Sequence, residues 1–190
     1  MVKDAPQYVE FQQYLSLTRQ KLSELNTIRI TRLNQQIQNE TDTVKLYQLY
    51  TSLCDTLRTY TQKDTKYEAD FSQALNSRAW YGFFLKKFPA VESDIREGMA
   101  LATKNKYLAT NLPPALLLQG KYKEALVAYR KYKDLPFGVQ GLPTYKEAFL
   151  DDLNAFEKAG IIPPQLEEDV NSIRRMLQGE DYPKGNGNKN

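Results

Sequence analysis

The strongest constraint on the fold of this chain is an internal similarity at an offset of 34 residues. Apolar residues at three positions recur in the same order: Phe88 is matched by Tyr122, Val91 by Ala125 and Ile95 by Tyr129. A period of this length is typical of arrays in which each unit is two antiparallel helices that bury their apolar faces by stacking on a neighbour. The offset therefore predicts an all-α stack of helix pairs, a fold that more often presents a surface to another protein than an active site.

The composition is that of a globular chain without a membrane or nucleic-acid signature. Of the 190 residues, 41% are hydrophobic and 26% are charged, and no run of about 18 apolar residues is present to span a bilayer. The net charge of +3 arises from 26 basic and 23 acidic residues spread along the whole length, whereas nucleic-acid-binding proteins gather Lys and Arg on one face. We therefore expect no membrane and no nucleic-acid partner. Residues 1–8 lack the apolar core of a signal peptide, so a cytoplasmic location is expected.

The chain lacks the residues that many catalytic and metal sites require, because it contains no His and a single Cys, Cys54. These numbers exclude a Cys/His zinc cluster, a Ser/His/Asp triad, a Cys/His pair and an internal disulfide. The sequence also has no Gly-rich phosphate loop, so we expect no catalytic residue, no metal site and no cofactor. Cys54 lies among Leu49, Leu53 and Leu57, and a free Cys behaves as a small hydrophobe, so we expect it in the core.

Residues 1–64 predict a long N-terminal helical hairpin. Apolar residues at helical spacings run through residues 7–38, namely Phe11, Leu15, Leu22, Leu25, Ile30, Leu33 and Ile37. The polar stretch 39–42 predicts a turn, and Thr41 or Asp42 can cap the next helix, residues 43–61. Two helices joined by so short a turn pack antiparallel. The hairpin is also long enough to pair with a second copy, so a homodimer is one alternative.

Residues 65–137 predict two repeat-like units. Asp64 caps a third helix that reaches about Lys87, and a fourth helix then extends to about residue 103. Pro89 suits the first turn of that fourth helix, because its missing N–H would be unpaired there. A fifth and a sixth helix meet at Gly120, which tolerates the positive φ of a sharp corner.

Residues 138–178 predict a closing pair of helices. Gly and Pro make residues 135–143 a loop, Thr144 caps a helix that ends near Gly160, and Pro163 and Pro164 begin the last helix. No segment alternates apolar and polar residues in the manner of a strand, so about eight helices and almost no strand are expected. The tail 179–190 has nothing to bury and is expected to be disordered.

The segment from Gly120 to Tyr129 resembles the second half of a tetratricopeptide repeat (TPR) unit. It has Gly at the corner, Tyr122 beside it, the small Ala125 where helices touch, and an aromatic residue one turn later. The resemblance implies a structural role for the signature residues Phe88, Val91, Ile95, Gly120, Tyr122, Ala125 and Tyr129. The stretch that begins at Asn111 also resembles the C-terminal part of bacterial TPR-containing proteins, which suggests that the chain is a piece of a larger protein.

The preceding unit, about residues 72–101, departs from the TPR pattern at two positions. Lys86 replaces the corner Gly, and Val91 replaces the small Ala. A third unit further upstream would place Cys54 and Leu57 in register and retains only apolar character.

A pair of prolines, Pro113 and Pro114, falls in the middle of the fifth helix. Each proline removes a backbone donor and crowds the preceding turn. The pair therefore predicts either a bend or a helix that begins only at Leu112.

The TPR resemblance implies that the first helix of each unit faces a concave groove in which a peptide lies. The residues then placed in the groove are Gln73, Asn76, Ser77, Trp80, Tyr107, Thr110 and Asn111. Asn111 stands where some family members hold the C-terminal carboxylate of a ligand, but Tyr107 replaces the Lys that assists it. Trp80 also has an interpretation as a core residue, and Asn111 can equally bond a neighbouring helix or face water.

Two runs of acidic residues are candidates for acid–base chemistry or cation binding: Asp151 with Asp152, and Glu167 with Glu168 and Asp169. Neighbouring residues of a helix point about 100° apart, so neither run converges on one point. We expect both runs on solvated helix faces, and the second also complements the dipole of its helix.

These features predict a non-catalytic protein-interaction module that binds a peptide or protein segment on a helical-repeat groove. The alternative is a structural or oligomerising helical element of a larger bacterial signalling protein. An enzyme is the least favoured class, because it needs a closed pocket with convergent ionisable groups.

Overall fold

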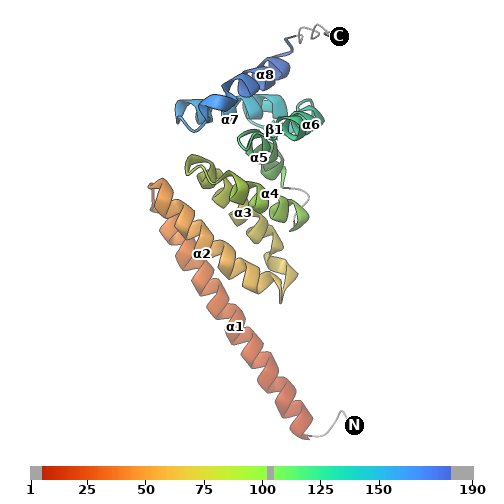
Figure 1. The fold of residues 1–190 in the computed structure, drawn as a ribbon. Coiled ribbons are helices and arrows are strands. Elements are labelled where there is room, and N and C mark those ends of the chain that lie inside the picture. Colours follow the sequence, from red (N-terminus) through yellow and green to blue (C-terminus); the bar gives the residue numbers. More distant parts are fainter. Residues whose placement is uncertain (1–5, 102–104, 181–190) are drawn as a thin grey trace.

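The computed structural model describes residues 6–101 and 105–180, and within them the chain is almost entirely helical (Figure 1). The elements in chain order are α1 (Pro6–Gln38), α2 (Thr43–Thr61), η1 (Thr65–Tyr67), α3 (Glu68–Phe84), α4 (Phe88–Leu101), α5 (Lys106–Leu117), α6 (Tyr122–Tyr132), β1 (Pro136–Val139), β2 (Leu142–Thr144), α7 (Tyr145–Lys158), η2 (Pro164–Leu166) and α8 (Glu167–Gln178). The all-α fold is therefore confirmed. The expected disordered tail, apart from residues 179 and 180, lies outside the described residues, as does the expected end of the fourth helix near residue 103.

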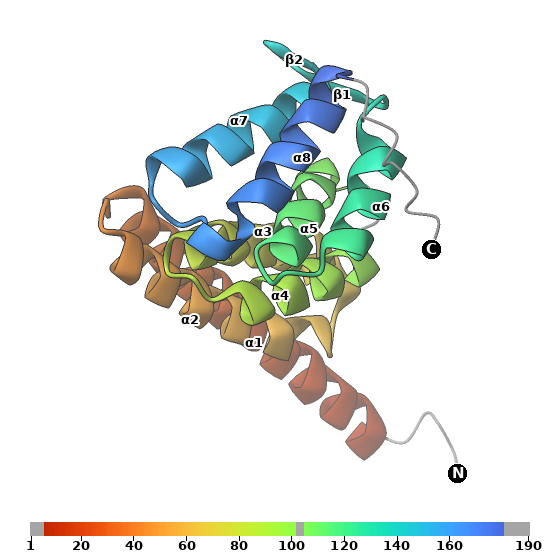
Figure 2. The same ribbon diagram turned by 45° about the horizontal axis from the view of Figure 1, so that its top comes forward.

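The helices are arranged as consecutive pairs that succeed one another along the molecule. Figure 1 shows α1–α2, α3–α4, α5–α6 and α7–α8 in that order from one end to the other, and Figure 2 shows the same layers from a second side. Three helical segments, α2, η1 and α7, begin with a polar capping residue that the sequence predicted. Asp42 accepts a hydrogen bond from Lys45 N at 2.8 Å, Asp64 accepts from Lys66 N at 3.0 Å, and Thr144 caps α7 together with Glu147.

The 34-residue offset is visible in the backbone of the two central pairs. Lys87 N donates to Gly82 O at 3.0 Å at the end of α3, and Lys121 N donates to Leu116 O at 3.1 Å at the end of α5. Both corners contain a residue with positive φ, Lys86 at 56° and Gly120 at 74°. Equivalent hydrogen bonds and dihedral angles, 34 residues apart, give α3–α4 and α5–α6 the same helix-ending turn.

The core consists of three apolar clusters that follow one another along the stack. The first cluster joins α2 to α3 around Cys54 and Leu75, which are fully buried as the sequence predicted for Cys54. Burial raises the pKa of the Cys54 thiol to about 12, so this thiol stays protonated. The second cluster lies among α3, α4 and α5 around Ile95, and the third joins α5 through α8 around Tyr129.

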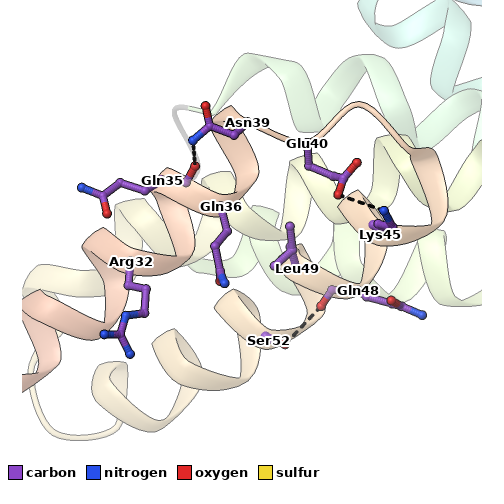
Figure 3. Close-up of a pocket in the computed structure, with 9 residues that line it drawn as sticks. All are labelled: Arg32, Gln35, Gln36, Asn39, Glu40, Lys45, Gln48, Leu49 and Ser52. Atoms are coloured by element: carbon purple, nitrogen blue, oxygen red, sulfur yellow. Dashed lines mark hydrogen bonds and ion pairs between the residues drawn. The ribbon is translucent and has the colours of Figure 1, made fainter.

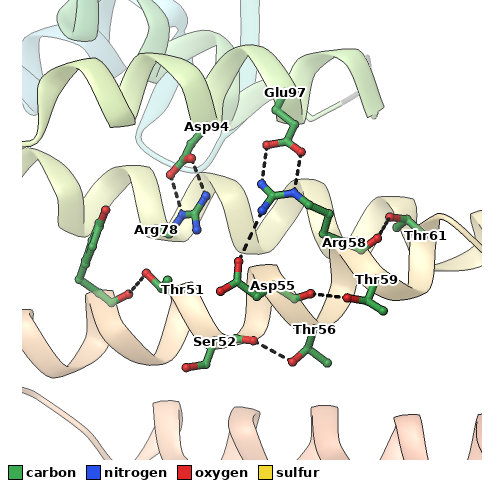
Figure 4. Close-up of polar contacts among 11 residues, drawn as sticks. Thr51, Ser52, Asp55, Thr56, Arg58, Thr59, Thr61, Arg78, Asp94 and Glu97 are labelled. Atoms are coloured by element: carbon green, nitrogen blue, oxygen red, sulfur yellow. Dashed lines mark hydrogen bonds and ion pairs between the residues drawn. The ribbon is translucent and has the colours of Figure 1, made fainter.

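The polar contacts of α2, α3 and α4 add charge pairs to the apolar packing (Figure 4). Arg78 of α3 makes a two-pronged ion pair with Asp94 of α4, with N–O distances of 2.8 and 2.6 Å, and both side chains are nearly buried. Arg58 of α2 reaches Glu97 of α4 at 2.8 Å. Arg78 therefore fixes α4 on α3, while Arg58 fixes it on α2.

A short β-hairpin forms in the loop expected at 135–143, and it supplies the little strand that the described residues contain. Residues of β1 and β2 pair antiparallel, with Val139 opposite Leu142, and Gly141 adopts a φ of 80° in the two-residue turn between them. Phe137 on β1 is 4% exposed because it packs against Tyr107 and Tyr145. The buried aromatic side chain, together with a Gly at the turn, accounts for the pairing.

Helix α5 runs continuously from Lys106 through Pro113 and Pro114, so the prediction of a start at Leu112 is wrong. Both prolines are buried, and the helix continues beyond them because Leu118 N still donates to Pro114 O at 2.9 Å. Apolar packing on the buried prolines offsets the backbone donors they remove from the helix interior.

The N-terminal hairpin differs from its prediction in how much of it is buried. The C-terminal end of α1 packs on α2 through Ile30, Leu33 and Ile37, but nearer the N-terminus Phe11 is 56% and Leu25 is 63% exposed. The reason is length, because α1 has 33 residues and its partner α2 has 19. The proposed third repeat register is also wrong, since the corner it requires near residue 52 falls inside α2.

Candidate functional site

Five of the seven residues predicted to line a groove surround a cavity of about 220 Å³. These are Asn76 and Trp80 from α3, and Tyr107, Thr110 and Asn111 from α5; the sixth lining residue is Asp152 from α7. The cavity thus collects side chains from the first helix of three successive pairs. The other two predicted residues, Gln73 and Ser77, do not line it, and Gln73 is exposed.

The two asparagines of the cavity bond each other across the boundary between units. Asn111 Nδ2 donates to Asn76 Oδ1 at 3.0 Å, and the Asn111 side chain is nearly buried. Asn111 therefore follows the interpretation in which it bonds a neighbouring helix. The bond holds α5 against α3 and fixes the orientation of both amides at the wall of the cavity.

Trp80 and Tyr107, the aromatic residues of the cavity, line it and also pack on aromatic residues outside it. Trp80 is half-buried; its ring packs edge-on against Phe84 and tilted against Phe156, with centroid distances of 5.3 and 5.8 Å. Tyr107 is 43% exposed and meets Phe137 edge to face at 5.6 Å. Trp80 therefore packs on core residues with one part of its ring system and lines the cavity with another.

Asp152 is the residue that the sequence analysis placed incorrectly. Asp151 is exposed as expected, but Asp152 is half-buried and lines the cavity instead of facing water. A signal was present in the sequence, because Asp152 stands three residues after the buried Phe149 and four before the buried Phe156. Helical spacing of three and four places it on the apolar side of α7.

The Asp152 carboxyl group has an unusual environment. It has no hydrogen bond or ion pair with any of the residues that the structure describes. Burial, and secondarily repulsion from Asp151, raise the pKa of Asp152 to about 7. Near neutral pH this carboxyl group is thus divided between its neutral and charged forms.

A larger hollow of about 580 Å³ lies on the α1–α2 hairpin (Figure 3). Four of its nine lining residues are Gln or Asn, and Glu40 faces Lys45 with an N–O distance of 3.6 Å. The Glu40 carboxylate already accepts hydrogen bonds from Thr41 N and Asp42 N at the turn. The charged Glu40 side chain of this hollow therefore stabilises the hairpin turn.

Residues 6–101 and 105–180 contain neither a cluster of metal-binding side chains nor a helix that could span a membrane. No group of three or more Asp, Glu, Cys or His side chains in this part of the chain could hold a metal ion. None of its helices has both the length and the apolar character needed to cross a bilayer.

Comparison with known proteins gives no match to this chain among family models, curated proteins or solved structures.

Proposed function

We propose that the chain is a TPR-like protein-interaction module, without catalytic activity, that binds a peptide or a protein segment on the face formed by α3, α5 and α7. The observation that carries the proposal is the cavity shared by these three helices, which gathers Asn76, Trp80, Tyr107, Thr110, Asn111 and Asp152. Amide, aromatic and carboxyl groups in one hollow are suited to a peptide, which offers hydrogen-bonding and apolar groups together.

The repeated corners at Lys86 and Gly120 support the TPR-like part of this proposal. They give α3–α4 and α5–α6 the same helix-ending turn. A stack of like pairs keeps the first helices on one side, where they form a continuous binding face.

A selection of random peptides displayed on phage, carried out on the full chain, tests the proposal. We expect enriched peptides whose binding is lost in Tyr107→Ser, because Tyr107 is an exposed wall of the cavity. Val127→Ser, on the exposed face of α6, is the matched control and is expected to bind normally. Peptides that bind both variants equally, or no enrichment at all, would contradict the proposal.

Self-association through α1 is a second candidate function, favoured by the apolar side chains that the body of the molecule leaves exposed. Six of them lie along or beside one stripe of the helix: Tyr8, Phe11, Tyr14, Leu22, Leu25 and Ile28, with exposed fractions between 40% and 67%. At such fractions each presents on the order of 100 Å². The total of about 600 Å² approaches the ~800 Å² per partner of a standard interface.

The spacing of residues along this side of α1 is suited to pairing with the same helix of a second copy. Tyr8, Phe11, Leu15, Thr18, Leu22 and Leu25 alternate spacings of three and four, which is the pattern of a coiled-coil seam. In an antiparallel pair Tyr8 lies opposite Leu25 and Phe11 opposite Leu22, and the two bodies occupy opposite ends. We infer an antiparallel homodimer as the occupant of this face.

Light scattering over a range of concentrations tests the self-association. A dimer is expected for the full chain and a monomer for Phe11→Ser/Leu25→Ser, whereas Val44→Ser on the exposed side of α2 is expected to leave the dimer intact. A monomer at every concentration for the unmodified chain would contradict this second function.

A further inference from the structure

The cavity among α3, α5 and α7 has the size of a side-chain pocket. Its volume of about 220 Å³ lies below the ~300 Å³ at which pockets for whole small molecules begin. A groove that binds an extended peptide uses pockets of this kind to select individual side chains. The chemistry of the wall therefore indicates which side chain enters.

The charged group of the wall is a carboxyl without a counter-ion. Lys106, whose Nζ lies 5.7 Å from the centroid of the Tyr107 ring, donates a hydrogen bond to Phe137 O at 2.9 Å, and Arg174 of α8 pairs with Glu157 at 2.8 Å. Asp152 thus lacks a cationic partner among the described residues. A buried carboxylate is stabilised when a positive charge joins it.

The remaining wall suits a cation and disfavours an anion. Trp80 and Tyr107 contribute aromatic rings, whose faces attract ammonium and guanidinium groups. The Asn76 oxygen, already turned toward Asn111, adds an acceptor. A peptide C-terminal carboxylate, the ligand that the TPR resemblance implies for Asn111, would instead be repelled by Asp152.

We propose that this pocket receives the lysine or arginine side chain of a bound peptide, with the Asp152 carboxylate as its counter-ion. The inference rests on the proposed function, since it names the chemistry of the peptide that the groove binds. Binding of the cation draws Asp152 into its charged form, so affinity rises as the pH is raised from 6 to 8.

The pH dependence belongs to Asp152 because few other titratable groups surround it. Asp151 is the acidic neighbour on its own helix, Tyr107 approaches from α5, and Tyr129 comes from α6. Asn76 and Trp80 from α3 do not titrate. Burial, and then the charge of Asp152, raise the pKa of Tyr129 above its usual value, so Tyr129 stays neutral in this range.

The test uses peptides selected on the full chain, and the fluorescence of Trp80 reports binding because Trp80 is the single tryptophan. We expect the selected peptides to share a Lys or Arg. Replacement of that residue by norleucine should weaken binding at least about tenfold, the usual scale of a charge-assisted contact. On Asp152→Asn the two peptides should bind alike, whereas Asp151→Asn, the same change at the exposed neighbour, should retain the preference.

The possible outcomes distinguish a failure of the cation pocket from a failure of the proposed peptide-binding groove. Selected peptides that depend on Tyr107 but carry no basic residue, or whose norleucine form binds equally well, would overturn the cation pocket and leave the groove intact. An unchanged preference in Asp152→Asn would also overturn it. The absence of any Tyr107-dependent peptide would instead overturn the proposed function itself.

Discussion

The helix pairs α3–α4 and α5–α6 have the same backbone turn but fill the space between their helices in different ways. At four positions separated by 34 residues the side chains of the two helix pairs differ in charge or in size. The ion pair Arg78–Asp94 corresponds to Leu112 and Ala128, as the sequence offset shows. The repeat geometry therefore does not depend on one set of contacts.

The second difference is an exchange of small and large residues across the helix contact. In α5–α6 the small residue is Ala125 of the second helix, and the first helix has Leu116 of the same apolar cluster at the position equivalent to Gly82. In α3–α4 the second helix has Val91, and the small residue is Gly82 of the first helix. The summed side-chain volume at the helix contact is therefore similar in the two pairs, but the larger side chain comes from the second helix in α3–α4 and from the first helix in α5–α6.

The ion pair is the largest difference between the two pairs, and a substitution that breaks it should have the largest effect. Arg78→Leu leaves Asp94 buried without its partner and should lower the free energy of unfolding by about 3–5 kcal/mol. Adding Asp94→Ala copies the apolar pair of α5–α6 and should restore most of that loss. Urea unfolding measures both variants; a double variant no more stable than Arg78→Leu would refute the equivalence.

The close contact at Gly82 gives the next largest effect. A Cβ atom placed on Gly82 would lie 2.7 Å from Cγ2 of Val91, so Gly82→Ala should destabilise α3–α4 by about 1–3 kcal/mol. In Gly82→Ala/Val91→Ala the clash is gone, and the two changes should therefore be coupled by at least about 0.5 kcal/mol in a double-mutant cycle. Strict additivity would contradict the proposed exchange of volume.

Substitution of the corner residue Lys86 should have the smallest effect on stability, and it should stabilise the chain instead of destabilising it. Lys86 is exposed and has a φ of 56°, a conformation that disfavours residues with a Cβ atom. Lys86→Gly should therefore stabilise the chain by about 0.5–1 kcal/mol, whereas Gly120→Lys should destabilise it by a similar amount. Thermal unfolding of both variants checks the opposite signs, and a loss of stability in Lys86→Gly would be the contrary result.

The comparison extends to α7, the first helix of the next pair. Helix α7 contributes an acidic residue, Asp152, to the cavity, whereas the cavity residues of α3 and α5 are uncharged. Because the pKa of this acid is raised to about 7 in the folded chain, the folded state holds a proton that the unfolded state has released. Asp152 therefore destabilises the chain progressively as the pH rises from about 4 to 7. Asp152→Asn should raise the melting temperature at pH 8 but not at pH 4. An equal effect at both pH values would show that burial does not control its titration.

Much of the fold could be predicted because local signals were strong. Asp42, Asp64 and Thr144 begin helices where short polar side chains precede an apolar stripe, and Gly120 ends one at its positive φ. The β-hairpin was missed because Gly and Pro indicate a loop, while the burial of Phe137 depends on Tyr107, thirty positions earlier in the chain.

The candidate site was predicted in part, for a related reason. Repeat spacing placed Asn76, Trp80 and Asn111 together, since residues of successive first helices are neighbours in a stack. Asp152 was missed because the β-hairpin lengthens the next interval, which removes the 34-residue register between α5 and α7. The exposure of the N-terminal part of α1 was missed as well, although the expected ranges 7–38 and 43–61 already made the first helix longer than its partner.

Hydrogen–deuterium exchange of the full chain with and without a selected peptide tests the central claim most directly, since it reports where the peptide lies. We predict that the bound peptide slows exchange in segments 73–80 of α3, 107–111 of α5 and 148–152 of α7, and leaves α6 and α8 unchanged. Protection confined to α1, or to the outer helices α4, α6 and α8, would contradict it.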